Sequence, residues 1–110
     1  MEKIKIFYEN NALTIKLLGE IDHHNARGVR EAIDSKIFEK KPSLVILDLS
    51  MVDFMDSSGL GLILGRYTIV KDMEAEFKIY KPSYGVKKIL ELCGIERLIK
   101  IEGDETNEAC

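Results

Sequence analysis

The sequence predicts a single α/β domain with a mixed, mostly parallel β-sheet, and three observations support this prediction. Apolar residues alternate with polar ones in residues 3–8 and again in residues 13–18, which is the period of half-buried strands. The period becomes helical between residues 22 and 40, and strand-like and helix-like segments then alternate along the chain. This alternation implies crossover connections and parallel strands. A chain of 110 residues has the size of one domain with one hydrophobic core.

The N-terminal half is expected to contain two strands, a helix and a central strand. The first strand, residues 3–8, is expected at an edge of the sheet; a hairpin with the second is compatible with the short link, and strand order stays open. Asp22 or Asn25 can cap the helix, and Pro42 ends it. Its apolar residues recur at helical spacing: Ala26, Val29, Ile33 and Ile37. Residues 44–47 form a continuous apolar run, as in a strand covered on both faces.

The C-terminal half is expected to contain two more helices and two short strands. A loop, residues 53–58, leads into a helix with the apolar positions Leu60, Ile63, Leu64, Tyr67 and Val70. Residues 77–80 form a strand, Ser83 caps the next helix, and Gly94 ends it. That helix has the apolar face Val86, Ile89, Leu90 and Cys93. A last strand is expected at residues 97–101, so the domain spans residues 1–102 and residues 103–110 form an acidic flexible tail.

Composition argues against several functional classes. The net charge is −3 with both signs scattered, so there is no basic stripe for nucleic acid. No apolar run approaches the roughly 20 residues of a membrane-spanning helix, and residues 1–8 lack the apolar segment of a signal peptide, so a cytoplasmic protein without a membrane partner is expected. Cys93 and Cys110 lie far apart, which indicates neither a disulfide framework nor a zinc site, and Cys93 is expected to be packed.

Two loops are expected to meet at one end of the sheet. Residues 19–24 and 53–58 each follow a strand, and in α/β proteins partners and ligands bind beyond the carboxyl ends of the strands. Ser57 lies where the second loop becomes a helix, so its hydroxyl is expected to be exposed beside unpaired backbone N–H groups. On local sequence alone, the simpler interpretation is that Asp56, Ser57 and Ser58 compete to cap the helix.

Other chemistries fit the residues less well. Gly59, Gly61 and Gly65 match neither a dinucleotide-binding fingerprint nor a Walker motif, so no cofactor is expected, and close helix packing is the favoured role of Gly61 and Gly65. A hydrolytic or phosphotransfer enzyme using Ser57 with His23 or His24 remains an alternative, although Met55 replaces the first glycine of a nucleophile elbow.

Metal and phosphoaspartate sites are also disfavoured. His23 and His24 are adjacent in sequence and point in different directions, so with Asp22 and Asp56 they make a poor metal site and none is expected. A phosphoaspartate receiver would need a strand and helix between its acidic pair and its acceptor, and another between the acceptor and Lys81-Pro82; neither is present.

Two segments resemble a known family. Residues 53–61, Asp-Phe-Met-Asp-Ser-Ser-Gly-Leu-Gly, together with residues 17–24, resemble the anti-sigma factor antagonists of the STAS (sulfate transporter and anti-sigma antagonist) family. The order and spacing of elements agree over nearly the whole chain apart from the acidic tail, and the run from Asp56 to Tyr67 is far more specific than a short motif.

The resemblance implies a regulatory protein rather than an enzyme. Its unphosphorylated form would bind an anti-sigma factor that is itself a serine kinase and so release a sigma factor; the kinase would then phosphorylate Ser57 and a serine phosphatase would reverse this. Glu20 and Asp22 match acidic positions that face the partner in this family. The expected partner-binding residues are Glu20, Asp22, His23, His24, Met55, Asp56, Ser57, Ser58, Leu60 and Gly61. A monomer is expected when the protein is free.

Overall fold

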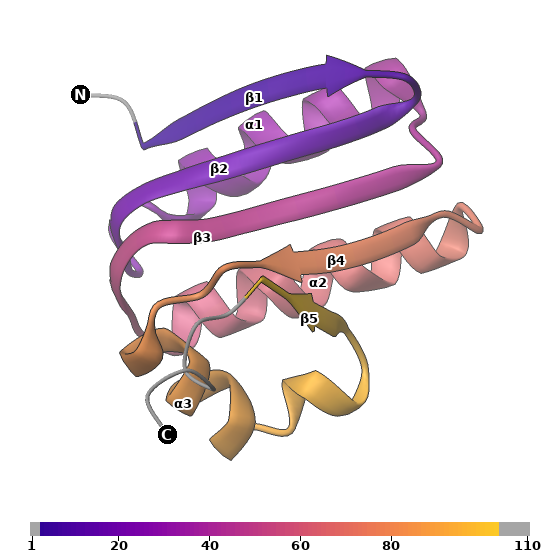
Figure 1. Ribbon diagram of the computed structural model, residues 1–110. Helices are drawn as coiled ribbons and strands as arrows, with labels where there is room; N and C mark the ends of the chain where they lie inside the picture. The colour runs from indigo at the N-terminus through magenta and orange to yellow at the C-terminus, as the bar shows by residue number, and fades with distance from the viewer. Residues whose placement is uncertain (1–2, 104–110) are drawn as a thin grey trace.

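The computed structural model describes residues 3–103 and shows one mixed sheet backed by helices (Figure 1). Five strands lie side by side in chain order, β1-β2-β3-β4-β5. The β1/β2 pair is antiparallel and the three other pairs are parallel, which confirms the expected mixed sheet with β1 at an edge. The strands are β1 (Ile4–Glu9), β2 (Ala12–Ile21), β3 (Leu44–Met55), β4 (Glu76–Tyr80) and β5 (Lys100–Glu102).

The helices connect the parallel strands and lie on one face of the sheet (Figure 1). They are α1 (Ala26–Lys40), α2 (Ser57–Asp72), α3 (Tyr84–Leu92) and a short 3-10 turn, η1 (Ile95–Arg97). The Ser83 hydroxyl accepts a hydrogen bond from Val86 N at the start of α3, as the sequence predicts. In the part of the chain that is described, no helix combines the length and apolar character needed to cross a membrane.

β1 and β2 form a two-residue hairpin. Glu9 pairs with Ala12, and the two residues between them, Asn10 and Asn11, have φ angles of 54° and 65°. Both angles fall in the left-handed region that this type of turn requires, and asparagine tolerates that region better than most residues. The Asn-Asn pair therefore favours the hairpin that the short link alone left open.

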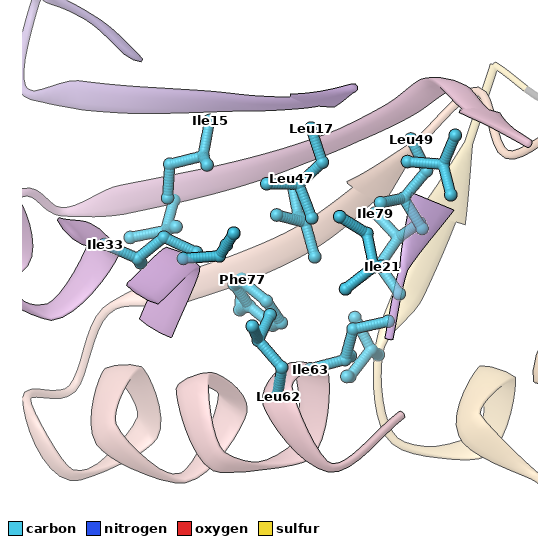
Figure 2. Packing of buried hydrophobic residues seen from close by; sticks show 14 of the residues in the cluster. Ile15, Leu17, Ile21, Ile33, Leu47, Leu49, Leu62, Ile63, Phe77 and Ile79 are labelled. Atoms are coloured by element: carbon cyan, nitrogen blue, oxygen red, sulfur yellow. The ribbon is translucent and has the colours of Figure 1, made fainter. Parts of the chain in front are cut away.

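The hydrophobic core lies between the sheet and the helices (Figure 2). Leu17, Leu47 and Ile79 come from three neighbouring strands and meet Ile33 of α1 and Ile63 of α2, all without exposed surface. Burying an aliphatic side chain of this kind contributes about 1.5–3 kcal/mol, so the helical spacing of α1 decides which of its faces meets the sheet.

Only one face of the sheet is covered by helices. Val45 and Leu47 are fully buried, whereas Leu44 and Ile46 on the other face are half-buried. The expectation that residues 44–47 are covered on both faces is therefore wrong. β3 is also longer than that apolar run, because Asp48 and Ser50 lie on the open face and do not end the strand.

Three further expectations are corrected. The last strand covers Lys100–Glu102 instead of residues 97–101, because η1 occupies the first part of that segment. Cys93 is exposed at the end of α3 and does not belong to its packed face. On α2, Leu64 is exposed and Arg66 faces inward. The acidic tail expected at residues 103–110 lies outside the described residues beyond Gly103.

The glycines of α2 have different roles. A Cβ atom on Gly59 would overlap Cγ of Met55 and lie 3.2 Å from the carbonyl oxygen of Ile21, so this position needs a residue without a side chain. A Cβ on Gly61 or Gly65 would meet no atom within 4 Å. The expectation that Gly61 and Gly65 allow close helix packing is therefore wrong, and Gly59 has that role instead.

This contrast predicts opposite effects for two neighbouring substitutions. Gly59→Ala should lower the free energy of unfolding by about 1–3 kcal/mol, since Met55 must move within a packed core. Gly61→Ala should raise it by up to about 1 kcal/mol, because alanine loses less backbone entropy in a helix and meets open space. Urea denaturation of both variants measures the two shifts, and a stabilised Gly59→Ala protein would contradict the packing.

Candidate functional site

Ser57 is the first residue of α2, and its side chain is exposed. The cap of this helix is Asp56, which has an extended backbone and whose Oδ1 accepts hydrogen bonds from Ser58 N at 2.8 Å and Gly59 N at 3.3 Å. Of the three residues expected to compete for the cap, Asp56 therefore takes it. Within residues 3–103 no hydrogen bond involves the Ser57 hydroxyl, so it is available to react without loosening the helix.

The loop after β2 lies against the start of α2, as expected from the strand ends. Asp56 connects the two segments through its backbone and its side chain. Its N–H donates to the carbonyl of Ile21 at 3.2 Å, and its Oδ2 accepts from His23 N at 3.3 Å. The same Oδ2 lies 4.0 Å from Nδ1 of His23. One carboxylate thus caps α2 and fixes the neighbouring loop.

Asp22 and Asn25 shape the loop between β2 and α1. Oδ1 of Asp22 accepts hydrogen bonds from His24 N at 2.9 Å and Asn25 N at 3.3 Å. Oδ1 of Asn25 accepts from Asp22 N at 3.1 Å, and its Nδ2 donates to the carbonyl of Glu20 at 2.9 Å. Asn25 occupies the N-cap position of α1 but its side chain makes no capping bond. These bonds hold the acidic residues of the loop in place.

The expected site residues do not all reach the surface. Glu20, His23, His24 and Gly61 are exposed, while Asp22, Asp56, Ser58 and Leu60 are half-buried, and the two loops bring them to one end of the sheet. Met55 is 2% exposed and belongs to the core. Its assignment to the partner-binding surface is therefore wrong.

Two apolar side chains that the sequence analysis missed are exposed in the last part of β3, which leads to this site. Met51 is 54% exposed and Phe54 is 49% exposed. Phe54 pairs with Glu20, next to the loop after β2. Exposed aromatic and methionine side chains beside polar groups are typical of the contact regions of protein interfaces.

A register shift explains why Phe54 is exposed and Met55 is buried. Gly19 pairs with Val52, but the next residue, Glu20, pairs with Phe54, so β3 has an extra residue at this point. Strict alternation from the buried Val52 would bury Phe54 and expose Met55; the bulge reverses the two. In the sequence, a glycine inside a strand indicates an irregularity, and Gly19 has a φ angle of +76°.

The site shows no arrangement for nucleophilic catalysis. In the described residues no hydrogen bond joins the Ser57 hydroxyl to His23 or His24, whose rings lie 4.0 Å apart against each other. An activated serine nucleophile usually has a base within hydrogen-bond reach. Besides the two histidines, this end of the sheet exposes the acidic Glu20 and Asp53 and the apolar Phe54, and Asp56 is half-buried.

The comparisons agree with this geometry. The STAS domain family model matches residues 4–107. An anti-sigma F factor antagonist from Paenibacillus polymyxa is 32% identical over 96% of this chain and 90% of its own length. One from Lysinibacillus sphaericus is 34% identical over 76% of this chain and 71% of its own length.

Solved structures show the same architecture. The anti-sigma factor antagonist SpoIIAA in its unphosphorylated form aligns with a TM-score of 0.80 at 28% identity, covering 96% of this chain and 91% of that chain. The phosphorylated form of SpoIIAA, described as a Bacillus cell fate determinant, aligns with a TM-score of 0.73 at 27% identity, covering 96% of this chain and 95% of that chain. The sheet order, the single helical layer and the family match together establish that this chain is a member of the STAS domain family.

Proposed function

We propose that this protein is an anti-sigma factor antagonist whose unphosphorylated form binds an anti-sigma factor and thereby releases a sigma factor. Relatives that match most of the chain are named anti-sigma F factor antagonists, and SpoIIAA has the same fold. The single observation that carries the proposal is the placement of Ser57 at the first turn of α2, where it is exposed beside acidic and apolar groups and its hydroxyl makes no hydrogen bond within residues 3–103. The protein acts in the cytoplasm as a monomer until it meets its partner.

Phosphorylation of Ser57 switches the protein off. The anti-sigma factor is a serine kinase that modifies Ser57, and a serine phosphatase restores the free hydroxyl. A phosphate adds about −1.5 to −2 charges to a surface that already has Glu20, Asp22 and Asp53. At a helix N-terminus the phosphate does not unfold the domain, so binding is lost through repulsion and altered contact at the interface.

The partner-binding surface combines the loop after β2, the first turn of α2 and the end of β3. From the expected set it keeps Glu20, Asp22, His23, His24, Asp56, Ser57, Ser58, Leu60 and Gly61; Met55 is removed, and Met51 and Phe54 are added. Phe54 supplies an apolar anchor in this surface in place of Met55. A phenylalanine half-exposed beside charged residues can bury its ring in a pocket of the partner.

Mapping the phosphate tests the switch. The protein is mixed with the Paenibacillus polymyxa anti-sigma F factor, the target named for one relative, and labelled ATP, and the modified residue is identified by mass spectrometry. We expect one phosphate, on Ser57. Ser57→Ala should abolish labelling, and Ser58→Ala should retain it because Ser58 is half-buried. Labelling of Ser58 instead, or complex formation without any labelling, would refute the assignment.

Asp22→Asn tests the acidic part of the surface. Asparagine keeps the Oδ1 acceptor that holds His24 N and Asn25 N, so the loop is preserved while the charge is lost. Charges at an interface mainly set the association rate, so the variant should associate about tenfold more slowly at low salt and with weaker salt dependence. Rapid-mixing measurements at two salt concentrations give both quantities. Glu96→Gln, the same change at an exposed position on η1, is the control; equal behaviour of the two variants would remove Asp22 from the interface.

A further inference from the structure

The outer face of α3 is basic. Residues 81–90 contain three lysines and no acidic residue, and they run from the end of β4 through most of α3. Lys88 is exposed, and it lines a shallow hollow of about 60 Å³ together with Tyr84, Lys87 and Glu91. The buried residues of α3 lie on the other side of the helix, against the core. The hollow therefore lies on the side of α3 that faces away from the sheet, at the margin of the molecule (Figure 1).

Two lysines of this face have aromatic contacts in place of acidic partners. The Nζ atoms of Lys81 and Lys88 each lie about 5.6 Å from the centre of a neighbouring tyrosine ring, and within residues 3–103 no ion pair involves them. Lys87 has Glu91 at 3.8 Å, one turn along the helix. The first turn of α3 contains no acidic residue, so the positive end of the helix dipole adds to the charge of the lysines. Carboxylates placed on this face would be stabilised.

The chain leaves β5 beside this face. The carbonyl of Glu102 accepts a hydrogen bond from Lys81 N at 2.8 Å. Gly103 follows with a φ angle of +70°, and a Cβ there would lie 2.7 Å from a ring atom of Tyr80 and 3.0 Å from Cγ of Lys81. Both the angle and the lack of space favour glycine at this point. Because α3 begins at Tyr84, three residues after Lys81, the residues that follow Gly103 start close to the N-terminus of the helix.

The next segment of the sequence has the opposite charge. Residues 104–110, the acidic segment, contain Asp104, Glu105 and Glu108 and no lysine or arginine. Five residues of extended chain span about 16 Å. The nine-residue helix α3 is about 14 Å long, so residues 104–108 can follow its whole length. A segment tethered this close is present at a high effective concentration, so weak ion pairs are sufficient to hold it.

We propose that residues 104–108 dock on the outer face of α3 and pair their three carboxylates with Lys81, Lys87 and Lys88. Exposed ion pairs are screened by salt, so the contact is strongest at low ionic strength. It shields the lysines from other acidic molecules, because the chain supplies its own competitor for this face.

The contact shares no residue with the partner-binding surface assigned above. It therefore does not depend on the proposed function, and it requires no change at Ser57. The start of α3 is nevertheless close to that surface, since the Ser83 hydroxyl donates to the carbonyl of Val52 in β3 at 3.4 Å.

A spin label on Cys110 tests the contact. Cys93 is exposed at the end of α3, so Cys93→Ser leaves one cysteine to label without changing the core. Backbone amide resonances of the ¹⁵N-labelled 110-residue chain are recorded with the nitroxide active and then reduced. We expect several-fold stronger broadening at Lys88 than at Tyr80, which lies against Gly103 and reports the tether alone. At about 1 M salt, where the Debye length is about 3 Å, this difference should vanish.

Charge variants separate docking from the tether. Three changes neutralise the acidic segment without altering its length: Asp104→Asn, Glu105→Gln and Glu108→Gln. Together they should reduce the broadening at Lys88 to the level at Tyr80. Lys88→Gln should reduce the broadening along α3, because one ion pair is lost. Lys5→Gln, the same change at an exposed position of β1 at the far edge of the sheet, should not (Figure 1).

A mixed sample distinguishes one chain from two. The ¹⁵N-labelled chain without a spin label is mixed with unlabelled chain that has one, and α3 should show no broadening. Broadening equal to that within one chain would mean that a second copy supplies the acidic segment, which would overturn the proposal. So would broadening at Lys88 that persists in the neutral variant, or equal effects of Lys88→Gln and Lys5→Gln. If Cys93→Ser fails to fold, the amide shifts of α3 between the unmodified chain and the neutral variant decide instead, and unchanged shifts would refute docking.

Discussion

Ser57→Asp should lower the affinity for the anti-sigma factor by about tenfold to a hundredfold, or about 1.4–2.7 kcal/mol, because it adds a like charge to an already acidic interface. Ser57→Ala should bind as tightly as the unmodified protein, since Asp56 caps α2 and the Ser57 hydroxyl makes no hydrogen bond in the described chain. Isothermal titration calorimetry with the Paenibacillus polymyxa anti-sigma F factor measures both affinities.

Two controls isolate the charge and its position. In Ser57→Asn the new side chain has nearly the shape of the one in Ser57→Asp but carries no charge. Its dissociation constant should lie within about threefold of that of the unmodified protein. Ser35→Asp places the same carboxylate at an exposed position of α1, away from the proposed surface, and should have no effect. Thermal melting of each variant excludes loss of fold as the cause. Equal weakening by Ser57→Asn and Ser57→Asp would show that shape matters at this position and charge does not.

Asp34→Ala should lower the free energy of unfolding by about 2–3 kcal/mol. Among the described residues, the carboxylate of Asp34 is the only partner of opposite charge for the buried Arg66. Burial already lowers the pKa of Arg66. Removing one partner of a buried ion pair costs about 3–5 kcal/mol. The Asp34 side chain retains 23% exposure, so water reaches the pair and the expected effect is smaller. Urea denaturation with an unchanged slope measures the loss.

Glu31→Ala is the matched control on the same helix. Glu31 pairs with Arg27 at 3.4 Å, but the Arg27 side chain is 81% exposed. An exposed ion pair of this kind contributes about 0.3–0.5 kcal/mol. If Asp34→Ala lowered the free energy of unfolding no more than Glu31→Ala does, burial would not determine the strength of the Arg66 ion pair, and the guanidinium would be in contact with water.

Most of the fold could be predicted because it follows from hydrophobic periodicity. Val29, Ile33 and Ile37 recur at helical spacing and are buried in α1, and Leu13, Ile15 and Leu17 alternate and are buried in β2. The loop positions of Ser57 and Asp22 follow from parallel strands that end at the same edge. These features depend on local patterns that extend over many residues.

The errors occur where one residue changes the pattern or where two segments meet. The bulge opposite Gly19 exchanges Phe54 and Met55, and alternation alone gives no sign of it. Leu64 was expected on the apolar face of α2 but is exposed, while Arg66 is buried because Asp34 on a neighbouring helix provides the opposite charge. Such a pair between α1 and α2 is visible only once the helices are placed beside each other.

The double role of Asp56 affects how long an off state would last under the proposed switch. Its carboxylate fixes the start of α2 and the adjoining loop, so adding or removing a phosphate on Ser57 requires no rearrangement of either segment. Without a slow conformational step, no inactive conformation of the protein persists after the phosphate is removed. The duration of silencing is then the lifetime of one phosphoester bond, and a cell can reset the response simply by changing the amount of phosphatase.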